Sequence, residues 1–178
     1  LVKEISQKIK PNLVIHHWSN NDVANNSYQM EKYFPDANNN RYKPYYEDGK
    51  IVYKSPYFFK VSPRVDSLML MKVINNFSRK FFLKKINNDD MQQIKKDAWN
   101  TTDLFIGKIS QLFENNVPKI ALISDYKVSS IYEKNDFITI YSKVPKALTG
   151  LPKDSHPTSD GHAYMIKSIL PTIKKKFK

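Results

Sequence analysis

Residues 1–18 read LVKEISQKIKPNLVIHHW, and this stretch decides the predicted fold. The first ten residues repeat apolar side chains at helical spacing, and Pro11 ends that helix. The following NLVIHHW (12–18) is short, apolar and rich in β-branched residues, which is typical of a buried strand. Helix, proline and buried strand make half of a βαβ unit, so the sequence predicts an α/β domain.

The rest of the chain continues this alternation of helices and buried strands. Apolar spacing predicts helices over 67–86 and 90–116, KIALISDY (119–126) and FITIY (137–141) are predicted strands, and a last helix starts after Thr158 or Ser159. We expect the apolar stripes of these helices to be core. In the first the stripe is Leu70, Val73, Ile74, Phe77 and Phe81, and in the last helix it is Ala163, Ile166, Ile169 and Leu170.

Residues 28–66 differ from this pattern. They are rich in Tyr, Pro and Asn and lack a helical period, and Asp48-Gly49 lies between two β-prone segments. That dipeptide predicts a hairpin turn. We therefore expect a single domain over 1–178 with a hairpin-bearing insertion at 28–66. The tyrosines of the insertion either pack onto the domain, which we favour, or line a substrate groove.

Composition excludes several classes of function. The 178 residues contain no cysteine, so disulfides, thiolate zinc sites and cysteine nucleophiles are excluded. No apolar run reaches the roughly 20 residues of a membrane span. The net charge is +12, but the lysines are spread along the chain, so no specific nucleic-acid contact is predicted. A basic nucleic-acid-associated domain and attraction to an anionic surface or polymer remain weaker alternatives.

A candidate catalytic pair lies in Asp154-Ser155-His156-Pro157. A carboxylate two residues before an imidazole can accept a hydrogen bond from one ring nitrogen, which makes the other nitrogen a better base. Pro157 stiffens the turn. The pair still needs a hydroxyl nucleophile and an oxyanion donor. A metal site built from His156, His162 and neighbouring aspartates is the less favoured alternative, so we expect no metal and no cofactor.

The oxyanion donor is predicted in WSNNDV (18–23), directly after the first buried strand. Ligands of open α/β sheets bind beyond the carboxyl ends of the strands. A side-chain amide at Asn20 or Asn21 is therefore well placed, although an ordinary asparagine turn would have the same local sequence.

Together the two stretches resemble a known family. NLVIHHWSNNDV is similar to the third block of the SGNH (GDSL-type) hydrolases, an apolar strand that ends in Gly-x-Asn-Asp. DSHPTSDGHAYMIKSIL resembles their fifth block, in which an aspartate shortly precedes His-Pro and an amphipathic helix follows. The hairpin stretch KPYYEDGKIVY is similar to one that some members carry. The resemblance implies a flavodoxin-like three-layer α/β/α fold around a parallel sheet.

The resemblance also implies roles for individual residues. His156 would be the general base and then the acid, Asp154 would orient it, and the Asn21 amide would donate to the oxyanion. Asp22 would hold its loop. Apart from the resemblance, we expect His162 to cap or buttress the loop of the histidine. The implied reaction is hydrolysis or transfer of an acyl group through an acyl-serine, with an ester or O-acylated substrate such as a carbohydrate.

Three departures separate the chain from the family pattern. Ser19 stands where the third block usually has glycine, and Asp154 lies two residues before the histidine where many members have three. The Gly-Asp-Ser motif of the nucleophile and the glycine that follows the second strand are both missing. We therefore expect a further segment of roughly 60 or more residues upstream of Leu1, carrying two βα units. Ser124, Ser67 and Ser155 are less favoured replacements.

Two readings compete at this point. One is an esterase or acyltransferase of the SGNH type, with its nucleophile upstream. The other is a non-catalytic binding or assembly protein that keeps the fold without the nucleophile. The family's habits give a modest preference for a secreted or cell-envelope location.

Overall fold

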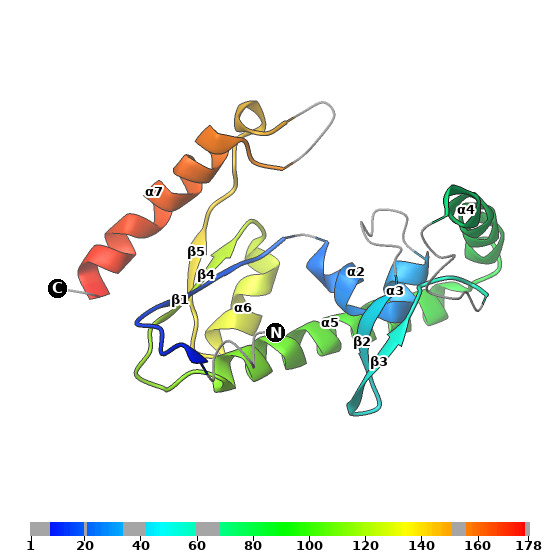
Figure 1. Cartoon of the computed structure of the whole chain (residues 1–178), viewed down its shortest axis with the longest axis horizontal. Helices are drawn as coiled ribbons and strands as arrows, with labels where there is room; N and C mark the ends of the chain where they lie inside the picture. The colour runs from blue at the N-terminus through cyan, green and yellow to red at the C-terminus, as the bar shows by residue number, and fades with distance from the viewer. Residues whose placement is uncertain (1–7, 20, 34–41, 60–67, 151–155, 177–178) are drawn as a thin grey trace. The chain divides into compact units, whose positions relative to one another are not determined.

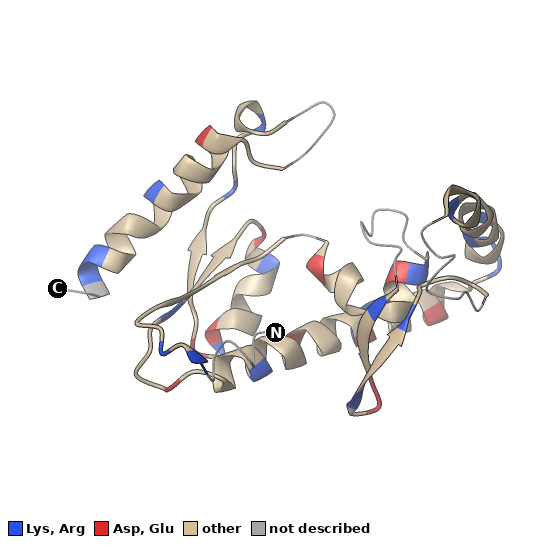
Figure 2. Cartoon of the chain, viewed as in Figure 1, with Lys and Arg blue, Asp and Glu red and all other residues tan. Residues whose placement is uncertain are grey.

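The computed structural model describes residues 8–19, 21–33, 42–59, 68–150 and 156–176 (Figure 1). Their contacts form two compact units. The first, here called the sheet unit, comprises Leu1–Asn20 and Phe105–Lys178; the second, the hairpin unit, comprises Asn21–Leu104. Lys and Arg occur along the elements of both units (Figure 2). A single domain with an insertion at 28–66 stays a prediction, and the helix expected over 1–10 lies mostly outside the described residues.

Three parallel strands form the centre of the sheet unit. They are β1 (Val14–His17), β4 (Lys119–Ile123) and β5 (Ile138–Tyr141), in the order β1-β4-β5. All five residues of β4 are buried, as expected for a central strand between helical layers. The three predicted strands are therefore confirmed, and the chain is an α/β protein.

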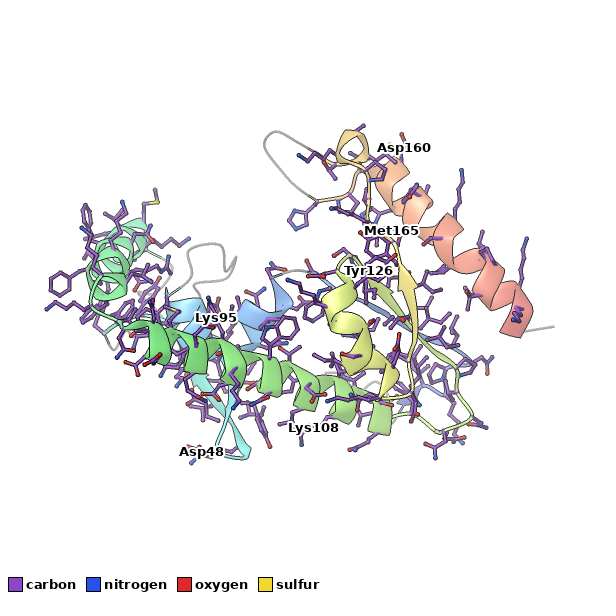
Figure 3. The ribbon with its side chains drawn as sticks, turned by 180° about the vertical axis from the view of Figure 1, so that it is seen from behind. Asp48, Lys95, Lys108, Tyr126, Asp160 and Met165 are labelled. Atoms are coloured by element: carbon purple, nitrogen blue, oxygen red, sulfur yellow. The ribbon has the colours of Figure 1, made fainter. Side chains whose placement is uncertain are left out.

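Helices cover both faces of this sheet. On one face Met165 and Ile169 of α7 (Ser159–Lys176) pack with Ile120 and Leu122 of β4. Figure 3 labels Met165 on this helix. Alternate residues of β4 point to the other face. That side holds α6 (Ser129–Glu133), whose buried Tyr132 packs against His16 of β1. The unit also contains the last part of α5 (Asn88–Gln111) and two short 3-10 helices, η1 (Tyr126–Val128) and η2 (Lys146–Leu148).

The inward side of α7 differs from the predicted stripe. Met165 and Ile169 are buried, whereas Ile166 is 55% exposed and Leu170 is 39% exposed. Apolar residues spread over a wide arc of this helix, so their spacing alone did not define the buried side. Gly161 is also buried and lies one turn before Met165, so Gly161, Met165 and Ile169 define the buried side of α7.

The hairpin unit contains α2 (Asp22–Asn26), α3 (Tyr28–Tyr33), β2 (Lys43–Glu47), β3 (Lys50–Lys54), α4 (Met69–Leu83) and the first part of α5 (Asn88–Gln111). The hairpin predicted at Asp48-Gly49 is present, and both turn residues have positive φ, 48° and 82°. This is the conformation that a two-residue I′ turn requires. The α3 helix was not predicted, because six residues are too few to display a helical period.

A buried glutamate links three elements of the hairpin unit. Glu31 of α3 is fully buried and accepts hydrogen bonds from the Tyr45 hydroxyl (2.7 Å) and the Lys43 ammonium (2.6 Å) of β2. Arg79 of α4 adds a favourable charge interaction. Burial nevertheless raises the pKa of the Glu31 carboxyl above its usual 4.5, because loss of water outweighs the hydrogen bonds from Lys43 and Tyr45.

The prediction that the apolar stripe of α4 is core is wrong. Its five members are each at least 41% exposed, and the buried residues of α4 are Asn75 and Arg79. The polar side of this helix therefore faces the unit, because Arg79 finds partners there: its Nε donates to the Lys32 carbonyl (3.1 Å).

We expect Glu31→Gln to change how stability depends on pH. A raised carboxyl pKa means that the folded state binds the proton of Glu31 more tightly than the unfolded chain does. The stability gained from this proton is fully present below pH 4.5 and is lost as the pH rises through the raised pKa. The free energy of unfolding of the wild type should fall relative to Glu31→Gln over that range, by at most about 1.4 kcal/mol per pH unit. Urea unfolding at several pH values measures this. Glu114→Gln, which changes an exposed glutamate, is the control, and a constant difference between wild type and Glu31→Gln would contradict the expectation.

Candidate functional site

His156 lies between η2 and α7, and the described residues on either side of 151–155 are joined through their backbones. The Gly150 N–H donates to the His156 carbonyl (3.0 Å), and an isolated antiparallel bridge joins Thr149 to Pro157. The His156 side chain is exposed. The imidazole is therefore open to solvent, next to a backbone carbonyl that is hydrogen-bonded.

Thr158 joins this loop to the start of α7. Its N–H and its hydroxyl both donate to the Leu148 carbonyl (2.9 and 3.0 Å), and the hydroxyl accepts a hydrogen bond from the Gly161 N–H (3.3 Å). The bond from the Gly161 N–H makes Thr158 the N-cap of α7, which is one of the two N-cap residues predicted from the sequence. A Cβ on Gly161 would lie 2.4 Å from the Leu148 carbonyl oxygen and 2.9 Å from Pro157 Cβ. Glycine is thus required where the helix meets the loop.

The predicted oxyanion donor lies at the start of α2. The Asn21 carbonyl accepts a hydrogen bond from the Asn25 N–H (2.9 Å), but its half-buried side chain makes no capping bond to the helix. The amide is therefore not used to begin α2. Asp22 lies in the first turn, where the helix dipole favours a carboxylate.

Ser19 precedes this helix at the end of β1. It is exposed and follows the buried Trp18, whose N–H donates to the Leu122 carbonyl (2.8 Å). This bond extends the β1–β4 pairing by one residue, so the chain leaves the sheet at Ser19. Parallel strands place their carboxyl ends at the same edge. The loops after β1 and after β5 therefore leave the sheet on the same side.

The predicted site residues divide between the two units. Ser19, His156, Pro157 and His162 belong to the sheet unit, whereas Asn21 and Asp22 belong to the hairpin unit. Convergence of Asn21 with His156 stays a prediction. Asp154 and Asn20 lie outside the described residues, so their roles also stay predictions.

Of the serines considered as replacements, Ser124 follows β4 at the carboxyl edge of the sheet and is half-buried. Ser67 and Ser155 lie outside the described residues.

The other histidines differ in their surroundings. His16 Nδ1 lies 2.8 Å from the Tyr132 hydroxyl, with the two rings edge to face at 5.4 Å, so this imidazole is part of the packing between β1 and α6. The side chains of His17 and His162 are exposed, so the capping or buttressing role of His162 stays a prediction. In the part of the chain that the structure describes, no three His, Asp or Glu side chains are grouped so that they could hold a metal ion.

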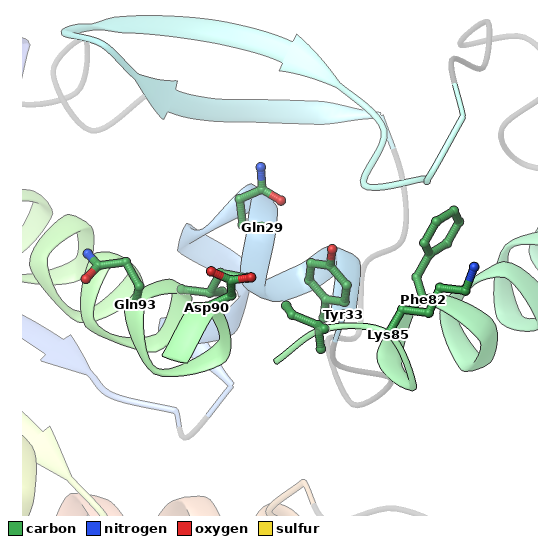
Figure 4. A pocket seen from close by; sticks show the side chains of 8 residues that line it. Gln29, Tyr33, Phe82, Lys85, Asp90 and Gln93 are labelled. Carbon is green, nitrogen blue, oxygen red and sulfur yellow. The ribbon is translucent and has the colours of Figure 1, made fainter. Parts of the chain in front are cut away.

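A separate pocket lies within the hairpin unit, where α3, the end of α4 and the start of α5 meet (Figure 4). It has a volume of about 520 Å³ and is lined by Gln29, Tyr33, Phe82, Lys85, Ile86, Asp90, Gln93 and Ile94. Two aromatic rings with amides and both signs of charge can hold a small polar ligand. Sequence reasoning missed this pocket, because no motif connects residues 29–33 with 82–94.

No family model, curated protein or solved structure matches this chain. Membership of the SGNH family therefore stays a prediction from the quoted stretches. Among the helices that the structure describes, none is long and apolar enough to cross a membrane.

We expect Gly161→Ala to destabilise the histidine loop. Its Cβ meets backbone and a proline ring, so the structure must shift, and overpacking of this kind costs about 1–3 kcal/mol. The free energy of unfolding should fall, and hydrogen exchange of the Gly150 and Thr158 amides should accelerate.

Gly107→Ala is the matched control. Its Cβ meets only the tip of the Asn135 side chain, at 2.9 Å, and a helical Gly→Ala change can gain up to about 1 kcal/mol. Equal effects of the two substitutions on stability and exchange would contradict the role assigned to Gly161.

Proposed function

We propose that this chain is part of a serine-type ester hydrolase or O-acyltransferase of the SGNH type. The observation that carries the proposal is the placement of two sequence blocks relative to the parallel sheet. One block contains β1 and the residues that follow it, the other contains His156 and the start of α7, and the segments after β1 and after β5 leave the sheet at its carboxyl edge. Sites of open α/β proteins form at this edge.

In the proposed reaction, His156 transfers the proton. A serine hydroxyl adds to the carbonyl carbon of the ester while its proton passes to one ring nitrogen of His156. Asp154 accepts a hydrogen bond from the other ring nitrogen and stabilises the imidazolium. The Asn21 amide donates to the oxygen that becomes negatively charged.

The intermediate then collapses to an acyl-serine, and the alcohol leaves with the proton from His156. A water or an acceptor hydroxyl next gives its proton to His156 and attacks the acyl carbon, which releases the serine. Water makes the protein a hydrolase; a hydroxyl acceptor makes it a transferase. An O-acylated carbohydrate is a fitting substrate for either outcome.

The nucleophile is proposed to come from outside these 178 residues. On the side of β1 away from β4, no further strand pairs with it among the described residues. A parallel sheet is normally continued or covered at such an edge. The proposed upstream strands would extend the sheet at β1 and bring the Gly-Asp-Ser serine to its carboxyl edge.

A non-catalytic binding or assembly protein is the second candidate. It is favoured by one observation, the absence of Gly-Asp-Ser from the 178 residues. The pocket of the hairpin unit would then be a candidate ligand site. The two functions differ in whether the natural protein turns over an ester.

We expect His156→Ala, made in the full-length natural protein, to reduce hydrolysis of a nitrophenyl ester by about 10³-fold or more, because the serine loses its base. His17→Ala is the matched control, since it removes another exposed imidazole of the sheet unit. Unchanged turnover in His156→Ala would rule out the assigned base. No turnover in the wild type towards any ester tested would favour the binding protein.

We expect Asn21→Ala to lower kcat by about 10²- to 10³-fold with little change in KM, because the amide would act on the charge that develops in the transition state. Steady-state kinetics of the same ester measure both constants. The stability of α2 should change little, since the Asn21 side chain does not cap it. An effect confined to KM would argue against an oxyanion donor.

A further inference from the structure

Helix α4 contacts the hairpin unit through its polar side. Asn75 and Arg79, one turn apart, are 1% and 3% exposed. Phe82 lies on the same side and stacks on Phe58, with ring centroids 4.6 Å apart and an interplanar angle of 10°. Together with the bond from Arg79 to α3, these contacts define which side of α4 faces the unit.

The opposite side of α4 is apolar and open to solvent. Leu70 and Phe77 are 66% and 71% exposed, and they belong to a continuous row that we call the α4 stripe: Leu70, Val73, Ile74, Phe77 and Phe81. The apolar stripe of an amphipathic helix in a soluble domain normally faces the core. A contiguous exposed apolar row instead indicates a surface that contacts something else.

Cationic side chains border the α4 stripe. Lys80, Lys84 and Lys85 are exposed, and the Lys85 ammonium lies over the Phe81 ring, 4.2 Å from its centroid. The helix Met69–Leu83 contains Lys and Arg but no Asp or Glu (Figure 2). Long apolar residues on one side, lysines beside them and no acid are the pattern of helices that lie in a membrane interface.

We propose that the α4 stripe inserts into the surface of an anionic lipid bilayer, with the helix axis parallel to the membrane plane. Leu70, Phe77 and Phe81 enter the boundary between headgroups and acyl chains, and the bordering lysines extend to the lipid phosphates. The net charge of +12 attracts the chain to such a surface. This binding is independent of the proposed catalytic function.

A second copy of the chain fits the same surface less well. Contact between two α4 stripes would bring the cationic borders of both helices into one interface, and α4 has no acidic residue to pair with them. An anionic bilayer supplies the complementary charge that the helix lacks. Charge complementarity therefore favours the lipid surface.

The test is co-sedimentation of the full-length protein with vesicles made of equal parts phosphatidylglycerol and phosphatidylcholine. We expect binding to these vesicles, much weaker binding to pure phosphatidylcholine, and loss of binding at high salt. The double variant Leu70→Gln/Phe77→Gln should bind at least about tenfold more weakly. Replacing Lys80, Lys84 and Lys85 by Gln should weaken binding by roughly a hundredfold in total.

Ile51→Thr is the matched control, because it changes an exposed apolar residue (56%) of β3 in the same unit, and it should bind like the wild type. Equal vesicle binding by the wild type and the double variant would overturn the proposal. So would a lipid-free dimer that the double variant abolishes, which would identify a second copy as the partner. A melting temperature lowered by several degrees in the double variant would mean that the protein itself covers the stripe, and would overturn it as well.

Discussion

Parallel pairing of β1, β4 and β5 is the constraint on which the rest of the sheet unit depends. Parallel neighbours cannot be joined by a tight turn. The chain must return over one face of the sheet between strands, and helices commonly form this connection and cover the face. The same pairing places every carboxyl end at one edge. Chain segments that are far apart in sequence, such as those after Ser19 and before His156, consequently leave the sheet on the same side.

Much of this architecture could be predicted from local patterns, and the failures have physical causes. Short β-branched runs identified the three strands, and Asp48-Gly49 identified the hairpin because its turn requires positive φ. Spacing failed for α4, because periodicity reports that a helix has two different sides and does not report which side is buried. In α4 the polar side is the buried one, because Arg79 donates a hydrogen bond to a carbonyl of α3. These residues are far apart in sequence, so no local pattern predicts the contact.

At the candidate site, the catalytic roles of Asp154, His156 and Asn21 stay predictions, and the structure confirms the predicted N-cap at Thr158. This cap follows from the local sequence. Glu31 and the pocket near Tyr33 do not, because their environments are assembled from segments distant in sequence. Chemistry that depends on such assembly becomes visible only in three dimensions. The proposed catalytic function rests on local sequence motifs, whereas the proposed membrane contact rests on packing between segments that are distant in sequence.

The position of the hairpin unit within the chain affects how the protein folds. Val14 pairs with Lys119, and the residues of the hairpin unit, 21–104, all lie between them in sequence. Closing so long a loop costs chain entropy and slows strand pairing. If the hairpin unit becomes compact first, the effective loop is shorter and β1 meets β4 sooner. In that case its packing would set part of the folding rate of a sheet to which none of its described strands belongs.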